Sequence, residues 1–221
     1  MIKEFNLRIL TSFALIILLV LMLKFSVVLI STLLLIFVIS WLEFNNLLER
    51  IYKRPKINIF QKNILKLFLF IYLLFFMKII LDEFITNQPN ISWNLVFVVF
   101  ICILSDVGGY IFGKTFKGKK LTRISPNKTY AGMIGSFILV IIFSIIYSYT
   151  ISFVDFWIIF IISILISLVC QIGDLLISLL KRKSKLKDTG NLLPGHGGLL
   201  DRIDGLLFAL PFGLLLINYF Y

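Results

Sequence analysis

The chain has 221 residues, 60% of them hydrophobic, and a mean hydropathy of +1.03. A soluble domain of this length cannot bury that much apolar surface, so the composition excludes a soluble globular protein. The net charge of +11 would suggest nucleic-acid binding in a soluble protein. In a membrane protein topology explains it better, and no nucleic-acid partner is expected. Cys102 and Cys170 lie in apolar segments without a CxxC motif, which argues against disulfide and zinc sites.

Apolar runs long enough to cross a bilayer occur at about residues 9–23, 25–42, 64–81, 92–113, 131–150, 154–180 and 199–219. Only Lys24 separates the first two runs, so one long bent segment is an alternative, and the span count lies between six and eight. The first run is not followed by a small-residue cleavage site and is expected to remain as an uncleaved helix. The expected fold is all-α: a polytopic helical bundle of about seven transmembrane helices.

The basic residues predict which loops share one side of the membrane. With seven spans, the N-terminus and the loops after the second, fourth and sixth spans lie on one face. That face carries every Lys and Arg except Lys24 and Lys78. The positive-inside rule makes it the cytoplasmic face. The polar loops 114–130 and 181–200 are therefore expected in the same compartment. The opposite face carries Asp82, Glu83 and Asp155.

The last two spans carry acids at positions where lipid makes a charge costly. One helical face near the end of the sixth span holds Gln171, Asp174, Ser178 and Lys181. Asp201 and Asp204, three residues apart, share a face of the next span. Acids inside spans usually point into the protein or a wet cavity. Three carboxylates suit Mg²⁺, which takes one or two of them and adds water and substrate phosphates. Interhelical salt bridges, such as Asp174 with Arg202, are the alternative interpretation.

The segment between these spans is rich in glycine and in basic residues. Its glycines permit a tight loop whose N–H groups approach phosphate oxygens, and the start of the seventh span adds the positive end of a helix dipole. Lys183 and Lys185 are expected only to anchor the loop at anionic lipid. For His196, phosphate contact or proton transfer and a plain surface position are equally open. The basic residues expected to meet substrate phosphate are Lys181, Arg182, Lys187 and Arg202.

A second basic loop follows the fourth span. Asp106 is another acid within an apolar run, and the glycines near it permit close helix approach. Ser125 and Pro126 punctuate the loop. Its basic cluster consists of Lys114, Lys117, Lys119, Lys120, Arg123 and Lys128. Alone this loop is weakly specific, but it shares a membrane face with the first one.

These motifs resemble the phosphatidate cytidylyltransferases (CDP-diacylglycerol synthases) over about residues 100–210. The C-terminal signature of that family is matched at Ser178, Lys181, Arg182, Lys187, Asp188, Gly190, Pro194, His196, Gly197, Gly198, Asp201, Arg202 and Asp204. Its Asp-x-Gly-x-Tyr and Ser-Pro-x-Lys-Thr segments are matched at Asp106, Gly108, Tyr110, Ser125, Pro126, Lys128 and Thr129. Mild departures from the family pattern stand at Val107, Asn127 and Ala131.

The resemblance implies transfer of the CMP moiety of CTP to phosphatidate, giving CDP-diacylglycerol and pyrophosphate in phospholipid biosynthesis. It implies Mg²⁺ as cofactor and leaves open a second cation such as K⁺ in the same carboxylate site, as well as a homodimer. A multi-pass protein of the bacterial inner membrane is expected, with its active site on the cytoplasmic face. The alternative function is a CTP-dependent lipid kinase of the polyprenol or dolichol type. An ion transporter is less favoured because the charge lies at one membrane edge and no repeat is visible.

The resemblance also assigns roles to residues. The expected metal ligands are Asp174, Asp201 and Asp204. The expected catalytic set, which grips phosphates or supports the residues that do, is Ser178, Lys181, Lys187, Asp188, His196 and Arg202. Binding of the cofactor and nucleotide is assigned to Ser125, Lys128, Gly197 and Gly198. Residues 1–95 are expected to form scaffold helices, and residues 96–221 the catalytic helices with loops 114–130 and 181–200.

Overall fold

Six long apolar helices make up most of the protein in the computed structural model, which describes residues 13–15, 17–53, 59–87, 92–122, 124–126, 128–150, 155–190, 192 and 197–220. The helices are α2 (Ser26–Ile51), α3 (Ile59–Thr86), α4 (Trp93–Phe116), α5 (Tyr130–Thr150), α6 (Phe156–Lys183) and α7 (Leu200–Phe220). Each is long and apolar enough to cross a membrane. The described residues contain no strand, and Lys120 and Thr129 form an isolated antiparallel bridge. The protein is a helical, multi-pass membrane protein, as the sequence predicted.

The first two predicted spans correspond to two successive helices. A shorter apolar helix, Phe13–Lys24, precedes α2. At the junction the Phe25 N–H donates to the Leu21 carbonyl at 2.9 Å, and the Leu29 N–H donates to the Phe25 carbonyl at 3.0 Å. Phe25, the N-cap of α2, has an extended backbone (φ −120°, ψ +114°), so the helix is interrupted there and the two apolar runs form separate helices.

The other predicted spans each coincide with one helix. Several helices extend beyond the apolar run because a helix keeps its backbone hydrogen bonds after the sequence turns polar. Thus α2 continues to Ile51 and α6 continues to Lys183. The last turn of α6 is basic, which complements the negative end of the helix dipole. At the other end, Asp155 accepts a hydrogen bond from the Trp157 N–H at 3.1 Å and caps the helix.

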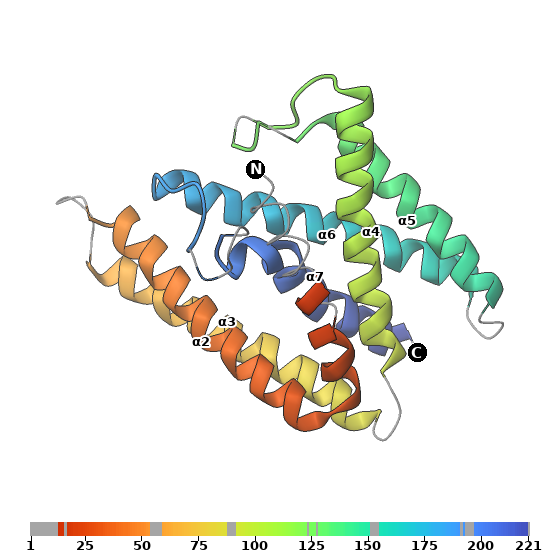
Figure 1. Cartoon of the computed structure of the whole chain (residues 1–221), viewed down its shortest axis with the longest axis horizontal. Coiled ribbons are helices and arrows are strands. Elements are labelled where there is room, and N and C mark those ends of the chain that lie inside the picture. The colour runs from red at the N-terminus through yellow and green to blue at the C-terminus, as the bar shows by residue number, and fades with distance from the viewer. Residues whose placement is uncertain are drawn as a thin grey trace. The chain divides into compact units, whose positions relative to one another are not determined.

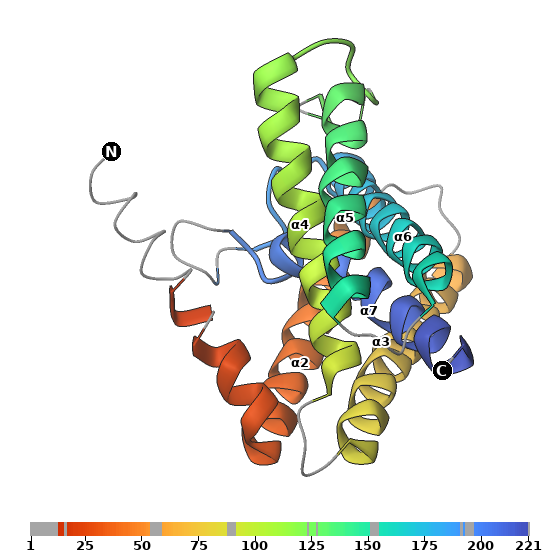
Figure 2. The ribbon, with the colours of Figure 1, turned by 90° about the vertical axis from the view of Figure 1, so that its right-hand side faces the viewer.

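The chain divides into two compact units. The first unit comprises Met1–Ser92 and Leu180–Ile203, and the second comprises Trp93–Leu179 and Asp204–Tyr221. Within the first unit α2 and α3 pack side by side (Figure 1), with the rings of Trp41 and Phe70 5.1 Å apart in an edge-to-face contact. Within the second unit α4 and α5 form the corresponding pair (Figure 2). The predicted division between scaffold helices and catalytic helices is a functional one and stays a prediction.

Glycines bring the backbones of α4 and α5 close together. A Cβ atom added to Gly108 would lie 2.6 Å from the Gly135 carbonyl oxygen, and one added to Gly132 would lie 2.7 Å from the Gly109 carbonyl oxygen. Small residues at such crossings allow helices in a membrane to pack by direct backbone contact. This close pair supports the loop that joins the two helices.

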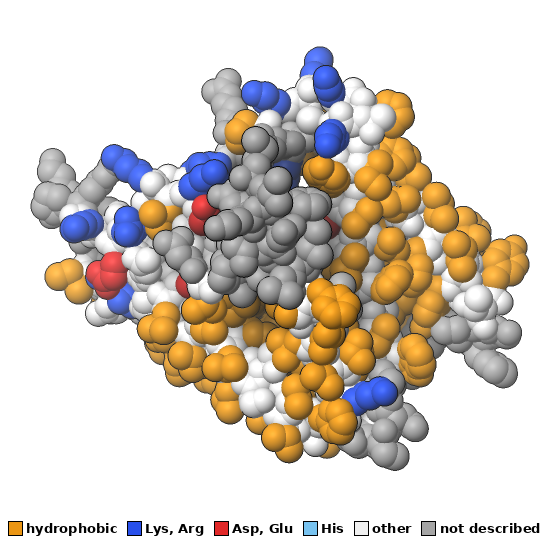
Figure 3. Space-filling model, in the orientation of Figure 1, with side chains coloured by type: hydrophobic (Ala, Val, Ile, Leu, Met, Phe, Trp, Pro, Cys, Tyr) orange, Lys and Arg blue, Asp and Glu red, His pale blue; other side chains and the backbone are white. Residues whose placement is uncertain are grey.

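The surface agrees with a membrane environment. Hydrophobic side chains cover much of the visible face of α4 and α5, and Lys and Arg side chains gather near the loop between these helices (Figure 3). Large apolar side chains such as Ile111 and Ile142 are about half exposed. An apolar surface of this extent is suited to contact with lipid.

Candidate active site

In the first unit, Asp201 at the start of α7 organises the loop between α6 and α7 (residues 184–199), the signature loop. Its Oδ1 accepts a hydrogen bond from Lys181 Nζ at 2.7 Å. Its Oδ2 accepts hydrogen bonds from the N–H groups of Thr189, at 2.7 Å, and Gly198, at 3.1 Å. The Lys181 and Asp201 side chains are 14% and 8% exposed. Both carboxylate oxygens are thus engaged in a largely buried network, and charge-assisted bonds of this kind are among the stronger ones in proteins.

A second acid, Glu43 of α2, also accepts hydrogen bonds from the signature loop and from the first residue of α7. Its Oε2 accepts hydrogen bonds from Thr189 Oγ1 at 2.7 Å and from the Leu200 N–H at 2.9 Å. Its Oε1 accepts a hydrogen bond from the Leu199 N–H at 2.9 Å. The first N–H groups of a helix lack partners within the helix. Glu43 therefore accepts hydrogen bonds from N–H groups at the start of α7, although it lies more than 150 residues away in sequence.

The ends of the loop follow from local backbone chemistry. After α6 the chain reverses at Lys185, which has a φ of +59°, and the Leu186 N–H donates to the Lys181 carbonyl at 2.9 Å. Gly197 has a φ of +88°, a value that favours glycine. A Cβ on Gly198 would lie 2.1 Å from Thr189 Oγ1 and 2.6 Å from Glu43 Oε1. The glycine pair of the signature is thus required by the packing of the loop against its two acids.

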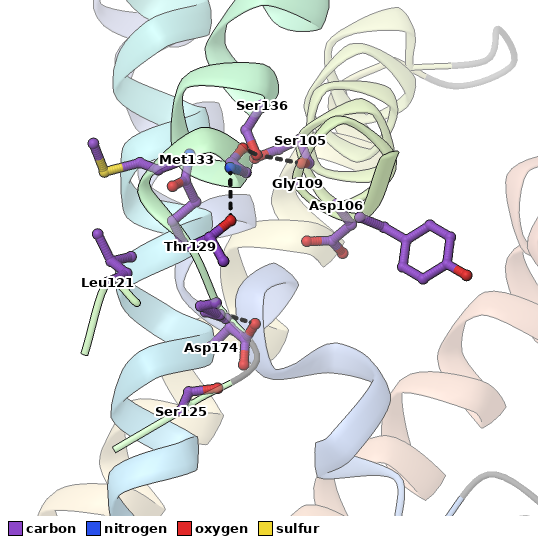
Figure 4. A pocket seen from close by; sticks show the side chains of 13 residues that line it. Ser105, Asp106, Gly109, Leu121, Ser125, Thr129, Met133, Ser136 and Asp174 are labelled. Carbon is purple, nitrogen blue, oxygen red and sulfur yellow. Dashed lines mark hydrogen bonds and ion pairs between the residues drawn. The ribbon is translucent and has the colours of Figure 1, made fainter. Parts of the chain in front are cut away.

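In the second unit, a cavity of about 270 Å³ opens between α4, α5, α6 and the loop that joins α4 to α5. Figure 4 shows the Asp106 carboxylate of α4 turned toward the space that Thr129 and Asp174 also line. Hydroxyl groups from Ser105 and Ser136 contribute to its wall. The cavity combines two acids, hydroxyls and Lys128, so it is a polar site at the level of membrane-spanning helices.

Lys128 and Asp174 form an ion pair across this cavity. Their side chains are 26% and 29% exposed, and Ser178 Oγ donates to Asp174 Oδ1 at 3.3 Å. The loop places Lys128 through backbone bonds: its N–H donates to the Ser125 carbonyl at 3.1 Å, and its carbonyl accepts from the Leu121 N–H at 2.8 Å. The sequence-predicted residues Ser125, Lys128, Asp174 and Ser178 therefore lie together within one unit, and Asp106 joins them.

The remaining predicted residues have varied positions. Lys187, Asp188 and Arg202 are exposed, and Arg182 is exposed at the end of α6. Asp204 Oδ1 accepts a hydrogen bond from the Gly205 N–H at 2.9 Å. Gly197 and Gly198 lie beside Asp201, as described above. His196, together with Pro194 of the signature and Arg123 of the second loop, lies outside the described residues.

The donor set is chemically suited to a hard cation. Asp201 belongs to the first unit, whereas Asp174 and Asp204 belong to the second. Within the described ranges, no group of three or more His, Cys, Asp or Glu side chains is gathered for a metal ion. Asp201 and Asp174 nevertheless each meet a lysine ammonium group, which supplies the positive charge that a divalent cation would bring. Carboxylate oxygens are the ligands that Mg²⁺ prefers.

Glu43 is not among the residues predicted from the sequence. It follows the apolar run of the second span and matches no signature position. A signal was present, since Glu43 stands between Leu42 and Phe44, where a charge is costly unless it has partners. Its partners, two backbone N–H groups and the Thr189 hydroxyl, are distant in sequence, and no spacing rule reveals them.

Comparisons with known proteins agree with this architecture. The profile of the Cytidylyltransferase family matches residues 1–220. This chain belongs to that family. A phosphatidate cytidylyltransferase of Bacillus subtilis (strain 168) is 36% identical over 134 residues, 58% of this chain and 50% of the relative. One from Haemophilus influenzae is 35% identical over 146 residues, 63% of this chain and 49% of the relative. One from Mycobacterium leprae is 42% identical over 121 residues, 54% of this chain and 39% of the relative. The matches span about half the length or less of these relatives.

Proposed function

We propose that the protein transfers the CMP moiety of CTP to phosphatidate, releasing pyrophosphate and forming CDP-diacylglycerol. The observation that carries the proposal is membership of the Cytidylyltransferase family, together with relatives named phosphatidate cytidylyltransferase. The signature residues support it, because Lys181 and Asp201 form a network in one unit, and Lys128 and Asp174 form a cavity-lining pair in the other.

The substrates explain why such a site belongs at a membrane surface. Phosphatidate is a lipid with a phosphate headgroup confined to the interface, and CTP is a soluble triphosphate with several negative charges. A phosphate oxygen of the lipid attacks the α-phosphorus of CTP, one P–O bond forms, and the bond to pyrophosphate breaks. The nucleophile is already ionised, so no strong base is needed. Positioning and charge stabilisation supply the rate.

The signature residues and Lys128 are proposed to bind substrate phosphates or to orient the residues that do. Lys128, placed by the backbone of its loop, faces a cavity that has room for a phosphate group. Lys181, Lys187 and Arg202 supply positive charge for the triphosphate at the signature loop. The Gly197 and Gly198 backbone lets phosphate oxygens approach closely. Ser178 orients Asp174 by its hydrogen bond, Asp188 supports the loop beside Gly197, and His196 is proposed to contact phosphate.

Mg²⁺ is the proposed cofactor. Asp174, Asp201 and Asp204 are the residues proposed to hold it. A second cation such as K⁺ at the same carboxylates is an open alternative. Bound there, Mg²⁺ would neutralise the triphosphate and stabilise the charge that develops on the leaving pyrophosphate. Removal of divalent cations with a chelator is therefore expected to abolish turnover, and added Mg²⁺ to restore it.

We place the active site on the cytoplasmic face of a bacterial inner membrane. The loops α2–α3, α4–α5 and α6–α7 are separated from one another by two spans each, so they share a face. All three contain basic residues, and the positive-inside rule favours the cytoplasm. Thiol labelling of a cysteine placed at Lys119 in intact cells tests the placement: protection from an impermeant reagent supports it, and labelling contradicts it.

Pyrophosphate release tests the reaction. Purified protein in detergent–phosphatidate micelles with CTP and Mg²⁺ is expected to release pyrophosphate only when phosphatidate is present. Release of CDP with a polyprenol, and no pyrophosphate with phosphatidate, would instead identify the CTP-dependent lipid kinase, which the relatives do not favour. A homodimer is proposed as well, and the mass of the detergent-solubilised particle measured by light scattering tests it.

A further inference from the structure

We propose that Glu43 is a positioning residue of the active site, which fixes the backbone of the signature loop through three hydrogen bonds. The inference deepens the proposed function and rests on it for its kinetic part. It concerns a residue of α2, outside the segment that carries the signature, and the three bonds all lie within the first unit.

Glu43 caps the N-terminus of α7, although it belongs to a different helix. The Leu199 carbonyl accepts the first helical hydrogen bonds of α7, from the N–H groups of Arg202 and Ile203 at 2.9 and 3.2 Å. The N–H groups of Leu199 and Leu200 themselves point away from the helix and have no partner within it. Glu43 accepts both at 2.9 Å. An anion at this position also interacts favourably with the positive end of the helix dipole.

Burial makes these bonds consequential. Glu43 is 8% exposed, Thr189 is 1% exposed and Leu200 is fully buried. Among the described residues, no Lys or Arg forms an ion pair with Glu43. Its charge is therefore matched by N–H and O–H donors of the loop. Removing an acceptor here leaves buried donors without partners, and that costs more than a bond at the surface.

Thr189 connects Glu43 to Asp201. Its hydroxyl oxygen lies 2.7 Å from Glu43 Oε2 and 3.1 Å from Asp201 Oδ2, and its N–H donates to the same Asp201 oxygen at 2.7 Å. The hydroxyl has one proton, so it can donate to only one of the two carboxylates at a time, and the shorter contact is to Glu43. Through Thr189, the position of Glu43 fixes the orientation of Asp201 and of the loop backbone.

The glycines next to these acids show how little room the arrangement leaves. A Cβ atom on Gly190 would lie 2.7 Å from Glu43 Oε1, and one on Gly198 would lie 2.6 Å from the same oxygen. The loop is thus closed around the Glu43 carboxylate, and a displaced carboxylate would displace the loop. Misplacement of a binding loop by about 1 Å can cost roughly 100-fold in rate.

Glu43→Gln tests the proposal, because the amide keeps the shape and replaces one acceptor oxygen with a donor. We expect hydrogen exchange of the peptide covering residues 198–202 to accelerate about tenfold or more, since protection follows the local opening free energy. We expect kcat/KM for CTP to fall about 10- to 100-fold. Glu49→Gln is the matched control, since Glu49 lies on the same helix but is exposed and bonded to Lys62 and Lys66.

A second pair keeps the test decisive if Glu43→Gln does not fold. Thr189→Val removes the hydroxyl that joins the acids, and Thr189→Ser retains it. We expect Val to reproduce both effects and Ser to restore both to near the unmodified values. Rescue by the conservative variant is a result that general loss of packing would not give.

The two measurements separate the ways in which the proposal can fail. If exchange at residues 198–202 is unchanged in both Glu43→Gln and Thr189→Val, Glu43 does not position the loop and the proposal is wrong. If exchange accelerates but kcat/KM stays within twofold, the contact is structural and the proposal is equally wrong. If the unmodified protein releases no phosphatidate-dependent pyrophosphate, the proposed function fails, and exchange alone then decides whether Glu43 holds the loop.

Discussion

The two units use the same chemical pair, a lysine with an aspartate, in different settings. Lys181 and Asp201 are nearly buried, and backbone N–H groups occupy the second carboxylate oxygen. Lys128 and Asp174 are about twice as exposed or more and line a cavity of about 270 Å³. The first pair is fixed in place by its surroundings, whereas the second borders open space.

This difference assigns different properties to acids that the sequence alone treats as equivalent. A buried carboxylate with several donors cannot change partners without breaking a network. A partly exposed ion pair contributes little to stability, about 0–1 kcal/mol, so its members can exchange partners when a ligand enters. We therefore expect Asp201 to matter for both structure and rate, and Asp174 to matter for rate and cation dependence.

Asp201→Asn gives the largest expected effect. The amide keeps the size of the side chain but cannot accept from both Lys181 and the loop amides. We expect activity to fall about 100-fold or more, and stability to fall by roughly 1–3 kcal/mol because a buried donor loses its partner. Pyrophosphate release and thermal unfolding in detergent measure the two.

Asp82→Asn is the control for that variant, because Asp82 is an exposed acid near the end of α3. Asp82→Asn should leave both the rate of pyrophosphate release and the thermal stability unchanged. An Asp201→Asn protein with near-normal rate would show that its carboxylate serves the fold alone, and the metal role proposed for it would be wrong.

Asp174→Asn is expected to give a large effect on rate without one on stability. Its ion pair with Lys128 is partly exposed, so its loss should leave thermal unfolding within about 1 kcal/mol. Turnover should fall about 10- to 100-fold, and the Mg²⁺ concentration for half-maximal activity should rise, because one oxygen ligand is lost. Titration of activity with Mg²⁺ measures this. A loss of stability as large as that of Asp201→Asn would erase the distinction between the two pairs.

Gly108→Ala tests the packing that supports the cavity. Its added Cβ would meet the Gly135 carbonyl oxygen at 2.6 Å and Ser136 Cα at 2.9 Å, and both are backbone atoms. We expect a loss of about 1–3 kcal/mol, the usual cost of overpacking. Gly109→Ala is the matched variant, because its nearest contact is the Ser136 side chain at 3.1 Å, and it should cost less. Equal unfolding temperatures for the two variants would contradict the close approach of α4 and α5.

The helices themselves could be predicted almost completely from the sequence. Hydropathy and charge locate each span because lipid permits few alternatives to an apolar helix. Only the junction at Lys24 was ambiguous, and there the extended backbone of Phe25 separates two helices. Charged ends such as those of α2 and α6 extend further than the apolar runs, because polar residues at the interface do not end a helix.

The site could be predicted only in part. The signature spacing identified Asp174, Lys181 and Asp201 as important, but it could not show that Asp201 is enclosed by Thr189 and Gly198 while Asp174 faces a cavity. That distinction depends on burial, which spacing does not encode. Glu43 was missed because its three partners are distant in sequence and two of them are backbone N–H groups, which have no residue type that a motif can record.

Glu49→Gln gives the smallest expected effect and sharpens the contrast within α2. Glu49 accepts from Lys62 Nζ at 2.5 Å and from Lys66 Nζ at 2.8 Å, and its side chain is 53% exposed. Salt screens such exposed pairs. We expect activity and thermal unfolding in physiological salt to match the unmodified protein, with a small deficit in unfolding temperature only at low ionic strength. These two bonds are as short as those of Glu43, so the length of the hydrogen bonds does not separate the two glutamates. A rate loss in Glu49→Gln equal to that in Glu43→Gln would mean that burial does not separate them either.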